Sequence, residues 1–202
     1  MKKRYISMAV CTLAAALSCL CAVSQRSQQH LAEKIIRLHV VANSDTQEDQ
    51  QTKLLVRDSV LRQAQRALAQ AEDPVSALRE SLPAIEQAAN ETLHELGCPD
   101  TARVTLRREL FPTREYDTFR LPAGVYRTLR VSIGSAAGHN WWCVVFPSLC
   151  LPAGAEAFEE VCRTAGFSEG EISLMTEQSQ EVELEFKTLE WLGKLKKMLW
   201  DA

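Results

Sequence analysis

His139–Cys150 reads HNWWCVVFPSLC and is the stretch that decides the fold. From Trp141 to Phe146, apolar side chains occupy both sets of alternating positions, a pattern typical of a central strand covered on both faces. Adjacent residues of a strand point to opposite faces, so Trp141 and Trp142 are expected on opposite sides of a sheet. The stretch therefore predicts a buried strand that carries one indole on each face.

The N-terminal sequence indicates export, and export predicts a disulfide between Cys143 and Cys150. Residues 2–4 are basic and precede an uncharged apolar run over residues 6–23, the layout of a secretory leader. Outside the reducing cytosol, two cysteines this close in sequence indicate a disulfide before they indicate a redox pair or a zinc site. Such a bridge either fixes the turn between the two cysteines as a preformed recognition surface or only staples the fold.

The leader has three readings. Ala22-Val23-Ser24 fits a cleavage site that would release a chain beginning at Gln25. The apolar run of about 18 residues is also at the short limit for a retained membrane anchor, and Cys19 fits a lipoprotein site weakly. We expect residues 1–24 to form a signal peptide or anchor and residues 25–202 to form a single domain.

Composition limits the classes of partner. The chain has 202 residues, 46% of them hydrophobic, which is enough to build a core. Beyond the leader, 20 basic residues face 26 acidic ones, a formal charge of −6. This balance argues against nucleic acid or an anionic membrane surface as the main partner. No motif for a cofactor or a metal ion is present, so we expect neither.

The first half of the chain predicts one strand and two helices. Residues 35–42 alternate, with Ile36, Leu38 and Val40 on one face and Arg37 and His39 on the other. A helix is expected from about 46 to 72, with a capping box at Ser44 and Gln47. Its apolar seam is formed by Leu54, Leu61, Ala64, Leu68 and Ala71 and is widened by Val56, Val60 and Ala67. Asp73-Pro74 begins a second helix, which Gly97 ends.

The second half predicts strands and covering helices. Strands are expected over residues 104–110, 125–133 and 140–146, the last two joined as a hairpin by a glycine-containing turn. A short helix over 155–165, a strand over 182–186 and a helix over 189–200 follow. The fold class is therefore α+β: an N-terminal strand and a helical hairpin, then a mostly antiparallel sheet covered by helices.

Four blocks of sequence resemble the stage II sporulation protein R family. They are residues 36–45 with Asp49-Gln50 and Lys53, residues 56–58, residues 111–116, and residues 121–126 running on to Cys150. The resemblance implies a protein that is secreted across the forespore membrane into the intermembrane space during endospore formation. There it would activate a membrane-embedded aspartic protease that processes the precursor of the mother-cell sigma factor E. It implies no catalytic residues.

These blocks contain the side chains that we expect to meet the protease. Tryptophan, tyrosine and arginine are enriched where proteins bind one another, and polar loops often carry recognition. Two plainer roles stay open, namely two core tryptophans and an arginine paired with an acid of its own loop. The expected partner-binding residues are Arg114, Tyr116, Asn140, Trp141, Trp142 and Pro147.

The alternative function is a secreted hydrolase or cell-wall-binding protein that uses Cys143, His139 or the acidic cluster Asp45, Glu48 and Asp49. His139 is expected about 13 Å from Cys143 along an extended strand, too far for a nucleophile and its base. His39 with Asp45 and Asp49 matches no metal-binding spacing, so a polar contact to the first helix is expected for it.

Two further features stay open. Cys98 and Cys162 are expected either to form a second bridge or to remain buried thiols. The basic helix over 189–200 either packs on the sheet or lies on lipid, so membrane contact is expected only through it or the leader.

Overall fold

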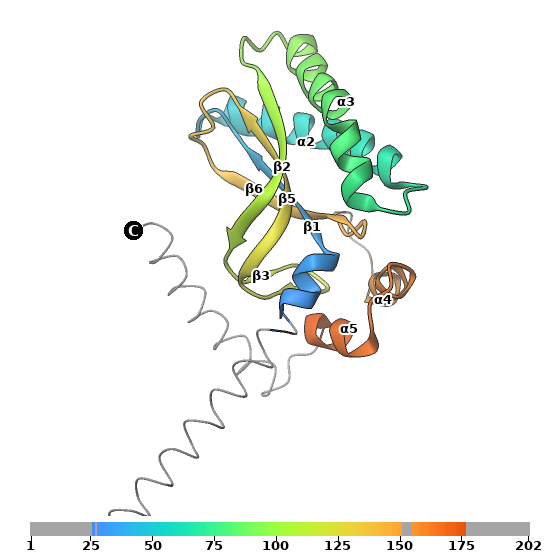
Figure 1. Cartoon of the computed structure of the whole chain (residues 1–202). Coiled ribbons are helices and arrows are strands. Elements are labelled where there is room, and N and C mark those ends of the chain that lie inside the picture. Colours follow the sequence, from blue (N-terminus) through green and yellow to red (C-terminus); the bar gives the residue numbers. More distant parts are fainter. Residues whose placement is uncertain (1–25, 27, 151–154, 177–202) are drawn as a thin grey trace, which may run out of the picture.

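A four-stranded mixed sheet forms the centre of the protein, which we describe from a computed structural model for residues 26, 28–150 and 155–176 (Figure 1). The strand order is β2-β5-β1-β6, and β1 and β5 run parallel while the other pairs are antiparallel. The strands are β1 (Ile36–Val41), β2 (Ala102–Phe111), β5 (Gly124–Ile133) and β6 (Asn140–Phe146). Helices lie on both sides of this sheet, so the expected α+β class is confirmed.

Strand β1 occupies the middle of the sheet, and this position corrects two predictions. All six of its residues are buried. Because β1 inserts between β5 and β6, the predicted β5–β6 hairpin is wrong. Among the described residues β6 is an edge strand, so its predicted central position is also wrong. Its two-sided burial is confirmed, since neighbouring Val144 and Val145 are both buried in different core clusters.

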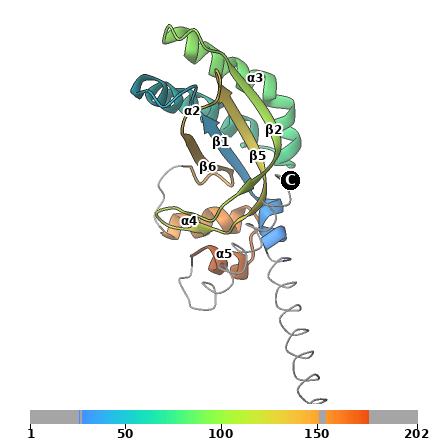
Figure 2. The ribbon, with the colours of Figure 1, turned by 90° about the vertical axis from the view of Figure 1, so that its left-hand side faces the viewer.

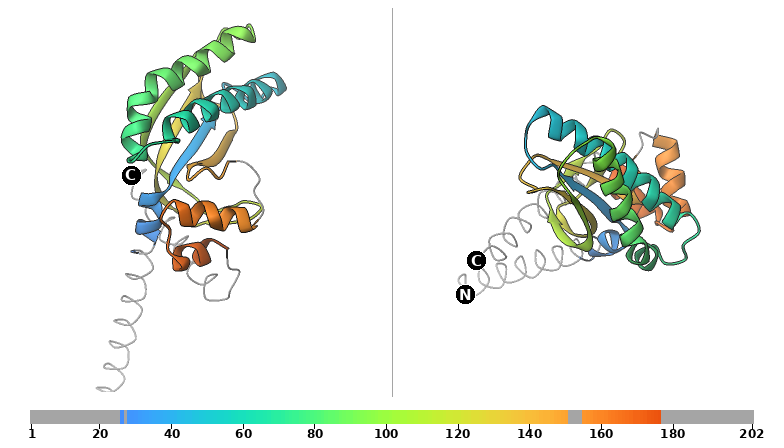
Figure 3. Two further views of the ribbon diagram at one scale, coloured as in Figure 1. Left: turned by 90° about the vertical axis from the view of Figure 1, so that its right-hand side faces the viewer. Right: turned by 90° about the horizontal axis from the view of Figure 1, so that it is seen from above.

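Helices α2 (Gln47–Leu68) and α3 (Pro74–Glu95) form an antiparallel pair over one face of the sheet (Figure 3). Asp73 caps α3 as expected, and its carboxylate accepts hydrogen bonds from the first-turn amides. The cap of α2 is Thr46, so the predicted capping box at Ser44 is wrong. Ser44 donates its hydroxyl hydrogen to Asp49 instead, which leaves the capping position to Thr46.

The face of α2 that meets the core matches the predicted seam in part. Its most deeply buried apolar residues are Val56, Val60 and Ala64, which pack with the helix-facing side chains of β1. Leu54, expected in the seam, is 38% exposed. Val56, Val60, Leu61 and Ala64 of the predicted seam are buried, so the prediction is correct at these positions and wrong at Leu54.

A second core lies on the opposite face, near one end of the sheet (Figure 2). It is covered by the helical residues 28–34, by α4 (Ala155–Thr164), by α5 (Glu169–Thr176) and by a small ribbon of β3 (Arg114–Glu115) and β4 (Arg120–Leu121). Helix α4 is confirmed. Helix α5 was not predicted. Its sequence does contain a start signal, because Ser168 and Glu171 form a capping box.

Three predicted segments lie outside the described residues: the leader over 1–24, the strand over 182–186 and the helix over 189–200. Within the described part of the chain, no helix is long and apolar enough to cross a membrane.

Candidate partner-binding face

Four of the six expected partner-binding residues lie together on the face of the sheet that α2 and α3 leave uncovered. Arg114 and Tyr116 come from the β3 region, whereas Asn140 and Trp142 come from β6. His39 and Phe111 of the sheet contact Asn140 and Trp142. Arg114 stacks on Trp142, and Arg37 of the sheet joins Tyr116 to Phe111. We call the set Arg114, Tyr116, Asn140 and Trp142, together with the sheet residues beneath it, the aromatic face.

Trp142 is the centre of the aromatic face. The guanidinium of Arg114 lies over its ring, 3.7 Å from the ring centroid. The rings of His39 and Phe111 flank it at 5.7 and 6.2 Å. A cation held over an indole face is attracted by the ring quadrupole, so Arg114 and Trp142 form a stacked pair rather than two independent side chains.

Arg37 lies beneath this pair and is fully buried. Its Nη2 donates a hydrogen bond of 2.6 Å to the Tyr116 hydroxyl, and its guanidinium lies 4.0 Å from the centroid of the Phe111 ring. Burial lowers the pKa of Arg37 and raises the pKa of Tyr116. The alternation of residues 35–42 placed Arg37 on this face, but nothing in the pattern showed that a charged residue would be enclosed there.

His39 connects the aromatic face to a charged network. Its Nδ1 lies 2.7 Å from Glu109 Oε2, and its Nε2 lies 2.7 Å from Asn140 Oδ1. The same carboxylate pairs with Arg107 and Arg130. The expected contact between His39 and the first helix is therefore wrong, because side chains alternate along β1 and α2 packs on the face that holds Leu38 and Val40. Among the described residues, no group of three metal-ligating side chains is present.

Comparison with known proteins identifies the family. A model of the family described as stage II sporulation protein R matches residues 32–155. The chain belongs to this family. It is 35% identical over 124 residues to the stage II sporulation protein R of Bacillus subtilis strain 168, which covers 60% of this chain and 55% of the relative. The chain thus spans about half the length of that relative. No solved structure matches it.

In this member of the stage II sporulation protein R family, the disulfide lies within the matched range. Cys143 and Cys150 are joined, with their Cα atoms 5.5 Å apart. The bridge ties β6 to the turn that follows it. The two other cysteines in the described part of the chain, Cys98 and Cys162, are free. Burial raises the pKa of the Cys162 thiol to about 11.

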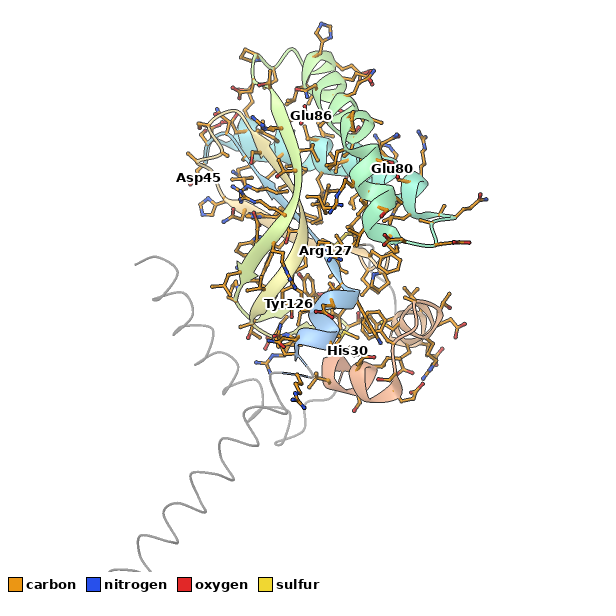
Figure 4. The ribbon with its side chains drawn as sticks, viewed as in Figure 1. His30, Asp45, Glu80, Glu86, Tyr126 and Arg127 are labelled. Atoms are coloured by element: carbon orange, nitrogen blue, oxygen red, sulfur yellow. A yellow bond between two sulfur atoms is a disulfide. The ribbon has the colours of Figure 1, made fainter. Side chains whose placement is uncertain are left out.

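Asp45 of the predicted acidic cluster holds the loop before β6 in place. Asp45, at the end of the sheet opposite Tyr126 (Figure 4), accepts a hydrogen bond of 2.6 Å from the backbone N–H of His139. Nearby, the Asn43 side chain accepts from the backbone N–H of Ser135 at 2.9 Å. A Cβ on Gly138 would lie 2.2 Å from the carbonyl oxygen of Ser44. These contacts join the segment after β1 to the segment before β6. They give Asp45 a structural role that does not depend on catalysis.

Trp141 and Pro147 lie away from the aromatic face. Trp141 packs against the helix-side core, with the Arg57 guanidinium 4.7 Å from its ring centroid. Pro147 is buried and lines a groove of about 690 Å³ between α2, α4 and the turn after β6. The two tryptophans are therefore on opposite faces, as alternation predicts, and only Trp142 belongs to the aromatic face.

Glu109 makes the aromatic face sensitive to acid. Burial raises its pKa, but hydrogen bonds from His39 and Arg107 outweigh burial and lower the pKa from 4.5 to about 2. A carboxylate with a depressed folded-state pKa stabilises the fold above the unfolded value, and the contribution is lost as the pH falls towards 2. We expect Glu109 to contribute about 3 kcal/mol at neutral pH.

Urea unfolding between pH 6 and pH 2 measures this contribution. Glu109→Gln is expected to be less stable at pH 6 and to lose less stability between pH 4.5 and pH 2 than the unmodified chain. Glu80→Gln is the control, because Glu80 is an exposed carboxylate of α3. Parallel curves for the unmodified chain and the Glu109 variant would contradict the prediction.

Proposed function

We propose that this chain is a secreted signalling protein of endospore formation. It is exported across the forespore membrane into the intermembrane space, where it binds the extracytoplasmic part of a membrane-embedded aspartic protease. The bound protease then processes the precursor of the mother-cell sigma factor E. Membership of the stage II sporulation protein R family supports the sporulation role, and the acidic net charge is consistent with a protein partner.

The observation that carries the proposal is the construction of the aromatic face. Its indole, phenol and guanidinium groups are held by strands, by a disulfide and by the Asp45–His139 contact. A surface that is already ordered loses little conformational entropy when a partner docks. The residue types are those that dominate the energetics of protein interfaces.

Activation requires more than attachment. A ligand shifts a conformational equilibrium only to the extent that it binds one state better than the other. The aromatic face therefore has to bind the active arrangement of the protease more tightly than the inactive one. A ligand with a fixed backbone suits this task, because only a few side chains can adjust to either arrangement.

The test is co-expression of the full chain with the protease and the sigma factor precursor, scored by precursor processing. Trp142→Phe and Arg114→Gln are expected to reduce processing by about tenfold or more, as for central interface residues. Trp141→Phe and Arg108→Gln are matched controls, because Trp141 lies on the opposite face and Arg108 is an exposed arginine of β2. Soluble yield and the thermal midpoint are measured for every variant.

Equal losses for the two tryptophan variants, or losses that follow the folded fraction alone, would remove the aromatic face from the interface. The hydrolase alternative gives a different result. Purified chain would then turn over a peptide or wall fragment without the protease, and a single substitution would abolish turnover in a folded protein.

A further inference from the structure

Arg37 carries a buried positive charge without a negative partner. Its side chain is fully buried, and none of the ion pairs among the described residues includes it. Within the same part of the chain, its Nε and Nη1 atoms have no hydrogen-bond partner. The Tyr116 hydroxyl accepts only from Nη2, and the rings of Phe111 and Tyr126 contact only the guanidinium group as a whole. Buried charges in proteins are normally paired, so this arrangement needs an explanation.

A second cation adds to the imbalance. Arg114 lies close enough to Arg37 to lower its pKa further, after burial, which is the larger cause. Arg114 Nε and Trp142 Nε1 are also buried donors without partners among the described residues. Three neighbouring side chains thus present unpaired N–H groups, and two of these side chains carry positive charge.

We propose that this cluster binds a carboxylate of the partner protein, with Arg37 as the buried anchor and Arg114 as the outer clamp. This assignment rests on the proposed function, because it names the chemical group by which the protease would be recognised. A carboxylate accepts charge-assisted hydrogen bonds from guanidinium N–H groups, and the Nε and Nη1 groups of Arg37 have no other acceptor among the described residues. It would also neutralise the repulsion between the two arginines.

Entry of the carboxylate requires a local movement. Arg37 is enclosed, whereas Arg114 is only partly buried and belongs to a ribbon in which β3 and β4 pair through two residues each. The carboxylate therefore reaches Arg37 when the Arg114 side chain leaves the Trp142 ring. Binding should then change the fluorescence of Trp142, because the stacked cation is withdrawn from the indole.

The first test uses the full chain and glutarate as a soluble carboxylate probe, at constant ionic strength. Glutarate is expected to raise the thermal midpoint and to change tryptophan fluorescence, and Trp142→Phe should lose the fluorescence change. At ten times its dissociation constant, glutarate should lower the unfolding constant about tenfold. Neutral glutaramide should have no effect. Sulfate or phosphate acting as strongly as glutarate would overturn the assignment to a carboxylate.

Two arginine variants test the geometry. Arg114→Gln is expected to weaken glutarate binding about tenfold or more, because it removes a charge-assisted hydrogen bond. Arg37→Lys keeps the charge but removes the planar fork, and should weaken binding similarly. Arg108→Gln should bind glutarate like the unmodified chain. Unaltered binding by both Arg37→Lys and Arg114→Gln would overturn the site.

The processing assay separates this inference from the proposed function. Loss of both glutarate binding and processing in folded Arg114→Gln supports the inference. Loss of glutarate binding with full processing overturns it and leaves the signalling role intact. Glutarate binding by an unmodified chain that never triggers processing overturns the signalling role, and with it the assignment of the carboxylate to that protease.

Discussion

Leu38→Ala is expected to destabilise the protein by about 3–5 kcal/mol, the upper range for a buried leucine. Leu38 is fully buried in the middle of the central strand, opposite Leu129 on β5 and Cys143 on β6. It faces the core under α2 and α3, so its loss leaves a cavity that strands on both sides prevent from collapsing. Urea unfolding monitored by circular dichroism measures the change.

Leu54→Ala is the matched control, because it removes the same atoms from a side chain that is 38% exposed. It is expected to cost less than about 1 kcal/mol, since little apolar area returns to water. Similar losses for the two variants would mean that Leu54 belongs to the seam after all. The comparison therefore tests the position of α2 as well as the importance of β1.

Local patterns predicted the elements but not their order in the sheet. Asp73 and Gly97 predicted the two ends of α3 correctly. Both act on a few neighbouring residues: Asp73 caps the first turn, and Gly97, with φ of 66°, ends the helix. The place of β1 between β5 and β6 depends on contacts about 100 residues apart. A glycine-containing turn between two strands favours a hairpin, and nothing nearby in the sequence shows that a third strand will take the position between them.

The candidate site was also predicted only in part, because residue types are visible in the sequence and long-range contacts are not. Arg114 and Trp142 were chosen for their residue types, and the structure stacks them. Arg37, Glu109 and His39 were missed as members of the site, because charged residues in alternating strands are ordinarily solvated. Their enclosure arises from the β3–β4 ribbon and from β6, which come from distant parts of the chain.

Tyr126→Ala is expected to have the largest effect, a destabilisation of about 4–6 kcal/mol. Tyr126 is fully buried beneath the aromatic face (Figure 4), and its hydroxyl donates a hydrogen bond of 2.6 Å to the carbonyl oxygen of Pro122. Its ring meets Phe111 edge to face with centroids 6.0 Å apart, and it lies beside the Arg37 guanidinium. Removing the ring leaves a cavity next to a buried charge, which adds to the ordinary cost of losing an aromatic side chain.

Tyr126→Phe separates the ring from the hydroxyl. It keeps the packing and leaves the Pro122 carbonyl unpaired, so it is expected to cost only about 1–2 kcal/mol. Burial also raises the pKa of Tyr126, so the hydroxyl stays neutral and keeps donating well into the alkaline range. The unfolding free energies should therefore rank Tyr126→Ala far below Tyr126→Phe, and Tyr126→Phe modestly below the unmodified chain. A Tyr126→Ala chain nearly as stable as Tyr126→Phe would show that the ring does not support the aromatic face.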